Sequence, residues 1–105
     1  MKPLSPDIAN KVYDILVETC GVNPDMRNSF VRDQTREFFR EWRIMGSLGF
    51  GGKFRRGDHG SLYVDCYSED ETPVRKEMIQ KANDLLDPLW PMWGDRENEE
   101  PTELL

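Results

Sequence analysis

The fold is decided by the stretch Trp42-Arg-Ile-Met-Gly-Ser-Leu-Gly-Phe-Gly-Gly-Lys-Phe-Arg-Arg-Gly-Asp-His-Gly-Ser-Leu-Tyr-Val-Asp-Cys-Tyr67. It contains six of the eight glycines of the chain, interspersed with aromatic and β-branched residues. Because glycine permits tight backbone turns, the glycine-rich parts at 46–52 and 56–60 predict two turns. Between them, alternation of apolar and polar residues predicts strands with a period of 2. The stretch therefore predicts a three-stranded antiparallel meander.

Strict alternation also assigns the residues to the two faces of this sheet. The face toward the core is predicted to carry Trp42, Ile44, Phe54, Leu62, Val64 and Cys66, and the outer face Arg43, Met45, Lys53, Arg55, Tyr63, Asp65 and Tyr67. The outer set combines cations with tyrosines, which suits contact with a carboxylate, a phosphate or an acidic protein loop. The alternative is ordinary cross-strand pairing of Arg43 or Arg55 with Asp65.

Helical periodicity flanks the predicted sheet on both sides. A first helix begins after the N-cap Ser5, with Pro6 at its first position, and ends at Gly21. A second starts at Asn23-Pro24-Asp25, and its end is open, because Phe38-Phe39 fits a helix end or a strand start. Thr72-Pro73 begins a third, which Pro88 stops. The predicted buried stripes are Met26, Phe30, Val31, Gln34 and Phe38 in the second helix, and Val74, Met78, Ile79, Ala82, Leu85 and Leu86 in the third.

The order of these elements predicts an α+β fold over residues 1–94. Two N-terminal helices and one C-terminal helix pack mainly on one face of the sheet, because so small a sheet is marginal in water when uncovered. Residues 95–105 form an acidic tail, with five acidic residues and one basic residue, that we expect to be flexible. Before it, Trp90 and Trp93 either cap the core or anchor a partner.

Composition limits the classes of partner. The chain has 105 residues and a formal net charge of −6, which argues against bulk affinity for nucleic acid or anionic lipid. It has no long apolar run and no secretory signal, and Cys20 and Cys66 lack metal-binding spacing and are predicted to be free thiols. These features predict a soluble, cytoplasmic protein whose partner is another protein.

The candidate chemical motifs fail on spacing. Gly46 to Lys53 departs from a phosphate-binding loop, which needs GxxxxGK followed by Ser or Thr and a helix. His59 is the only histidine and lies on a predicted turn without a nucleophile. The adjacent carboxylates Glu69-Asp70-Glu71 cannot converge on one ion. The sequence therefore predicts no catalytic residue, no metal site and no cofactor.

The residues Arg43-x-x-Gly46-Ser-Leu-Gly-Phe-Gly-Gly-Lys-Phe54, Tyr63-Val-x-Cys-Tyr67 and Glu69-Asp-x-Thr-Pro73 resemble a family of small uncharacterised proteins of bacteriophages and prophages. The resemblance covers nearly all of the chain up to the tail. The family has no assigned activity, so the resemblance implies a biological context and no particular chemistry. It implies a location in the cytoplasm of a bacterial host and roles such as binding and inhibiting a host defence system.

The leading functional hypothesis is a non-enzymatic protein-interaction module. Its contact residues are the outer face and glycine hairpin, namely Arg43, Lys53, Arg55, Tyr63, Tyr67, Gly49, Gly51 and Gly52, or else the C-terminal set of Trp90, Trp93, Glu97, Glu99 and Glu100. The acidic tail could imitate nucleic acid in a basic groove of the partner. The alternatives are a binder of nucleotides or other anionic ligands that uses Arg43, Lys53 and Arg55, and a homodimeric or larger structural subunit.

Overall fold

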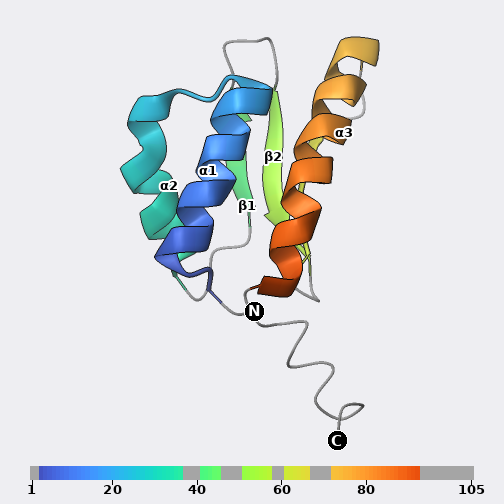
Figure 1. The fold of residues 1–105 in the computed structure, drawn as a ribbon. Helices are drawn as coiled ribbons and strands as arrows, with labels where there is room; N and C mark the ends of the chain where they lie inside the picture. Colours follow the sequence, from blue (N-terminus) through green and yellow to red (C-terminus); the bar gives the residue numbers. More distant parts are fainter. Residues whose placement is uncertain (1–2, 37–40, 46–50, 58–60, 67–71, 93–105) are drawn as a thin grey trace, which may run out of the picture.

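Helices pack on one face of an antiparallel sheet, as the sequence predicts (Figure 1). The computed structural model describes residues 3–36, 41–45, 51–57, 61–66 and 72–92, and the side chains at 66 and 90–92 are excluded from this description. The elements follow the order α1 (Pro6–Cys20), η1 (Pro24–Met26), α2 (Arg27–Gln34), β1 (Glu41–Met45), β2 (Gly51–Arg56), β3 (Leu62–Cys66), α3 (Pro73–Leu86) and η3 (Asp87–Met92), where η marks a 3₁₀ helix.

Both ends of α1 and the start of α3 confirm the capping residues that the sequence predicts, whereas Asn23 caps the 3₁₀ helix η1 instead of α2. The Ser5 hydroxyl accepts a hydrogen bond from the Ile8 amide at the start of α1, and Gly21 ends this helix at φ 71°, in the left-handed region. At the start of α3, the Thr72 hydroxyl accepts from the Arg75 amide at 3.1 Å. Beyond Leu86 the chain continues as the 3₁₀ helix η3, which contains Pro88.

The sheet has the strand order β1-β2-β3, and both strand pairs are antiparallel. Trp42 lies opposite Phe54, which lies opposite Val64, so the predicted inner residues share one face. Ile44, Phe54, Leu62 and Val64 are buried, and Trp42 is half-buried. The predicted alternation is therefore confirmed wherever the structure describes the side chains.

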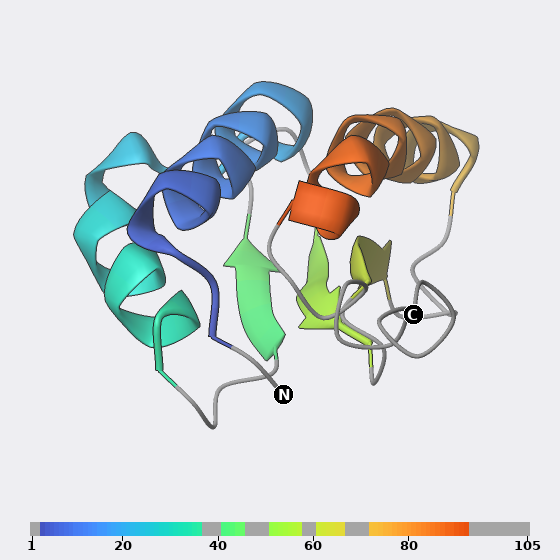
Figure 2. The ribbon, with the colours of Figure 1, turned by 60° about the horizontal axis from the view of Figure 1, so that its bottom comes forward.

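The helices form a layer over the inner face, with α1 between α2 and α3 (Figure 2). An aromatic cluster joins the layers. Phe30 of α2 lies with its ring centroid 5.2 Å from that of Tyr13, 5.0 Å from that of Trp42 and 5.5 Å from that of Phe54. Aromatic rings remove much apolar surface from water when they are buried, so this cluster helps to hold α1 and α2 on the sheet, while α3 packs on β3.

Three described residues of the predicted helix stripes are exposed, whereas Val31, Met78 and Ile79 are half-buried. Met26 is 43% exposed, because η1 precedes α2 and Met26 ends the 3₁₀ turn instead of occupying the inner face of α2. Val74 and Leu85 are 66% and 42% exposed. The α3 helix packs against α1 and β3 through a narrow stripe that includes Ala82 and Leu86, which leaves the wider predicted face partly in solvent. Phe38 and Tyr67 lie outside the described residues.

The inner face also carries a cation, Arg56, outside the predicted set of inward residues. Arg56 follows Phe54 by two positions, so alternation directs it toward the helices, and it is only 4% exposed. Its Nη1 donates to the backbone oxygen of Gln34 at 3.2 Å, and the same oxygen accepts from the Leu4 amide. Buried polar groups require such partners, and this contact ties the end of α2 to β2.

Candidate functional site

The outer face of the sheet carries the residues that alternation predicts. Lys53 lies between Arg43 and Asp65, and Arg55 lies between Glu41 and Tyr63. Glu41 is within 3.7 Å of the Lys53 ammonium and 3.5 Å of the Arg55 guanidinium. Arg55 also reaches Asp65 at 3.9 Å, and its Cζ lies 5.9 Å from the Tyr63 ring centroid.

Of the two pairs in the cross-strand alternative, Arg55–Asp65 is present, whereas Arg43 does not pair with Asp65, because β2 lies between β1 and β3. Lys53 and Arg55 have carboxylate neighbours, so their charges are partly compensated within the sheet. Each pair is exposed and therefore contributes only about 0–1 kcal/mol to stability. Arg43 differs, because no described carboxylate lies within ion-pair distance of it. Arg43 is thus the cation of this face that is most accessible to a partner's carboxylate.

Arg43 borders an apolar groove of about 320 Å³ at the edge of the sheet, between β1 and the turn that follows α1. The groove is lined by Val22, Asn23, Met26, Trp42, Arg43 and Met45. Its volume is near the lower limit for ligand sites, which is about 300 Å³, so it fits one or two side chains better than a large cofactor. Met45 is 76% exposed at this position.

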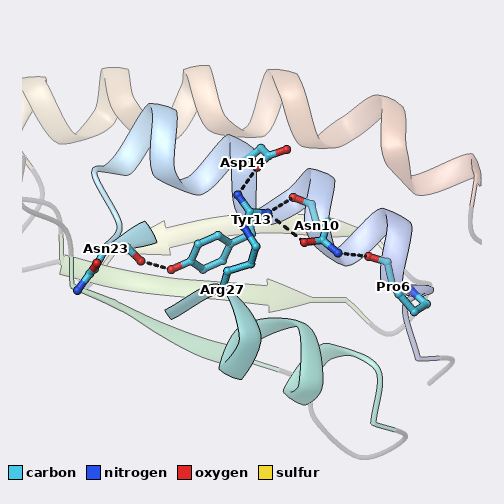
Figure 3. A network of polar contacts seen from close by, with 6 residues as sticks. All are labelled: Pro6, Asn10, Tyr13, Asp14, Asn23 and Arg27. Atoms are coloured by element: carbon cyan, nitrogen blue, oxygen red, sulfur yellow. Dashed lines mark hydrogen bonds and ion pairs between the residues drawn. The ribbon is translucent and has the colours of Figure 1, made fainter. Parts of the chain in front are cut away.

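The wall formed by Val22, Asn23 and Met26 depends on local signals in the sequence. Gly21 adopts the left-handed conformation that turns the chain out of α1. The Asn23 side chain then accepts from the Asp25 amide at 2.9 Å, which starts η1. The hydroxyl of Tyr13 donates to the Asn23 backbone oxygen and so fixes this wall to α1 (Figure 3).

Arg27, at the start of α2, reinforces the same wall (Figure 3). Its guanidinium carbon lies 5.0 Å from the Tyr13 ring centroid. It donates to the backbone and side-chain oxygens of Asn10 at 3.2 and 3.1 Å, and it forms an ion pair with Asp14. An arginine that bridges two helices and stacks on an aromatic ring holds them in a defined arrangement, so this wall of the groove is held in place by α1 and α2.

Burial changes the titration of two side chains near this wall. It raises the pKa of the Tyr13 phenol above its ordinary value of 10.0, and this effect outweighs the lowering by the Met26 amide and the Arg27 cation. Burial likewise raises the pKa of the Cys20 thiol above 9.0. Both groups are therefore protonated at neutral pH, and the thiol lacks the thiolate character of a reactive cysteine.

The predicted glycine site is only partly described. Gly51 and Gly52 belong to β2, and Lys53 continues this strand, whereas the lysine of a phosphate-binding loop begins a helix. Gly49, Tyr67, His59, Trp93 and the tail residues Glu97, Glu99 and Glu100 lie outside the described residues, and so does the side chain of Trp90.

The groove itself was missed by sequence reasoning. Period-2 alternation correctly predicts Met45 and Arg43 on the outer face, whereas helical periodicity predicts Met26 in the core. The exposed methionine at the end of η1 follows the Asn-Pro-Asp signal for a tight turn, and this signal could have indicated that Met26 precedes the regular helix.

Among the residues described, no group of three or more His, Cys, Asp or Glu side chains could hold a metal ion. Within the same ranges, no helix has the length and apolarity needed to cross a bilayer. Comparison with protein-family models, with curated proteins and with solved structures gave no match to this chain.

Proposed function

We propose that this chain is a non-enzymatic protein-interaction module that binds its partner through the groove beside β1. One observation supports this most directly. The structure describes four large apolar side chains that are substantially exposed, namely Met26, Met45, Val74 and Leu85. Met26 and Met45 are distant in sequence and line the same groove.

Exposed apolar side chains that converge on a groove favour contact with a protein, because the contact removes their surface from water. Methionine suits such a site, since its flexible thioether adapts to different partner side chains. The role of a phage-encoded inhibitor, which the family resemblance implies, is one form of this proposal. In that form the partner belongs to a bacterial defence system.

Affinity capture from a bacterial lysate tests the proposal with matched variants. In the test variant, Met26→Lys and Met45→Lys place charges in the groove. In the control, Leu85→Lys and Val74→Lys change side chains of similar exposure on α3, 42% and 66% against 43% and 76%. We expect a partner, identified by mass spectrometry, that the unaltered chain and the control retain and the groove variant loses.

Equal retention by the two variants would show that the groove is not the binding surface. A third protein that ends at Gly94 separates the groove from the acidic tail. Loss of the partner on this truncation, with retention by the groove variant, would assign binding to residues 95–105 and contradict the proposal. Circular dichroism and thermal unfolding of each variant establish that the proteins compared are folded.

A further inference from the structure

The two edges of the sheet differ in how their backbone groups are satisfied. At the β3 edge, the side chain of Asn83 from α3 accepts a hydrogen bond from the Val64 amide at 2.8 Å and donates to the Val64 carbonyl at 3.3 Å. This side chain thus occupies the position that a further strand would take. At the β1 edge, no strand of the described part of the chain pairs with the backbone.

The hydrogen-bond pattern identifies which β1 groups point outward. In an antiparallel ladder, the N–H and C=O of successive residues point to alternate sides. Val64 directs its N–H and C=O to Asn83, away from β2, so Val64 and its opposite residue Phe54 are not hydrogen-bonded to each other. Phe54 therefore directs its N–H and C=O toward β1, where they pair with Trp42. A second bond gives the same result independently, because the Gly57 amide donates to the Ser61 backbone oxygen at 2.8 Å and so points toward the β3 side. Phe54, three positions earlier, must then point its backbone groups to the opposite side, toward β1.

Because Trp42 points its backbone groups toward β2, its neighbour Arg43 points them out of the sheet. The open backbone groups therefore lie beside the groove that Arg43 helps to line. The Arg43 side chain points to the outer face, and no described carboxylate pairs with it. Backbone donor, backbone acceptor, cation and apolar groove thus occur together at one edge.

We propose that the partner adds an extended segment to β1 as a fourth strand, with an acidic residue opposite Arg43 and apolar residues on either side of it. This inference rests on the proposed function and specifies its partner. A residue paired with Arg43 projects to the same outer face, where a carboxylate meets the guanidinium. The flanking residues project toward the helix layer, where Val22, Met26 and Trp42 line the groove.

The sequence pattern of the partner follows from this geometry as apolar-acidic-apolar in an extended segment. Backbone pairing supplies affinity, and the alternate side chains supply specificity. A helical ligand fits less well, because its backbone hydrogen bonds are internal and cannot pair with the groups of Arg43.

Nuclear magnetic resonance titration of the full chain tests the proposal with a blocked peptide, Ser-Thr-Val-Glu-Val-Thr-Ser. We expect the largest amide shifts at Arg43, Met45 and Val22. A control peptide carries an N-methyl group on the glutamate nitrogen, which removes one backbone donor and keeps every side chain. The N-methyl group removes one backbone hydrogen bond and disturbs the extended pairing, so we expect this peptide to bind the chain about tenfold or more weakly than the unmodified peptide.

Charge exchange tests the acidic position separately. A second control peptide has lysine in place of glutamate and should bind the unaltered chain several-fold more weakly, by roughly the contribution of one charge-assisted pair. The variant Arg43→Glu, a change at an exposed side chain, should reverse this preference. Failure of the reversal would overturn the assignment of the carboxylate to Arg43.

Three further outcomes would overturn strand addition. The first is equal binding of the N-methylated and unmodified peptides, and the second is absence of binding by the unmodified peptide. The third is a dimer, seen by sedimentation, that Arg43→Glu dissociates, because a second copy would then occupy the edge. In each case the proposed function survives if the Met26 and Met45 variants still lose the captured partner. If capture is unaffected by those variants, the proposed function fails independently.

Discussion

Asn83→Ala is the substitution that best tests the protected edge of β3. It removes both hydrogen bonds to the Val64 backbone, at 2.8 and 3.3 Å, and leaves a part-buried amide and carbonyl without this partner. At about 1 kcal/mol for each bond, the expected loss is about 2 kcal/mol. Alanine has a higher helix propensity than asparagine, which offsets about 0.5 kcal/mol of this loss. The net loss of unfolding free energy is therefore about 1.5 kcal/mol.

Urea denaturation followed by circular dichroism measures this loss, with Gln80→Ala as the matched control. Gln80 is on the same helix, and its amide donates to the exposed Asp84 carboxylate at 2.7 Å, so the control loses one exposed bond. It gains less helix propensity than Asn83→Ala does, because glutamine is a better helix former than asparagine. We expect it to change stability by less than about 0.5 kcal/mol. The midpoint of thermal unfolding should be roughly 6–12 °C lower in Asn83→Ala than in the unaltered chain.

Hydrogen exchange makes the test specific to the edge. The Val64 amide should exchange faster in Asn83→Ala than in the control, whereas the other amides of β3 that pair with β2 change less. Equal stability of the two variants, or unchanged protection of the Val64 amide, would refute the conclusion that Asn83 occupies the edge position. The Gly57–Ser61 bond would then be the remaining evidence that the Arg43 backbone groups point out of the sheet.

Three other substitutions test the core and the groove wall. Phe30→Ala empties a fully buried site among three rings and should cost about 4 kcal/mol in urea denaturation, and a loss below about 2 kcal/mol would contradict the central place of this ring. Gly21→Ala forces a side chain to φ 71° and should cost about 1 kcal/mol, whereas no loss would show that the turn tolerates the strain. Tyr13→Phe removes the donor to Asn23 and should cost about 1 kcal/mol; it should also reduce the alkaline loss of stability. Because burial raises the pKa of Tyr13 above 10.0, the native state keeps a proton that the unfolded chain releases, so stability falls as pH rises above about 10, and an identical pH profile of Tyr13→Phe would contradict this assignment.

The sequence was sufficient for the features that depend on neighbouring residues. Period-2 alternation placed Ile44, Phe54 and Val64 on one face, and the cap residues Ser5 and Gly21 set the limits of α1. Such signals are local, because caps and strand alternation involve residues a few positions apart.

Other features depend on contacts between distant segments, which local patterns do not encode. Met26 fitted a helical stripe, yet the 3₁₀ turn of η1 leaves it exposed beside Met45, from a strand nearly twenty positions later. Asn83 would ordinarily be assigned to the solvent face of a helix, but the position of α3 beside β3 brings its amide to the Val64 backbone. The groove and the covered edge are both products of tertiary packing.

The charged residues of β1 reconcile an open edge with selective binding. Exposed edges promote indiscriminate strand pairing, and charged side chains at the edge oppose it. Glu41 and Arg43 provide such charges, but only Glu41 is compensated by described neighbours, Lys53 and Arg55. A strand that places an apolar or basic residue opposite Arg43 desolvates or repels the guanidinium without compensation, whereas an acidic residue pairs with it. The same cation that disfavours most strands therefore selects the one with a carboxylate in register.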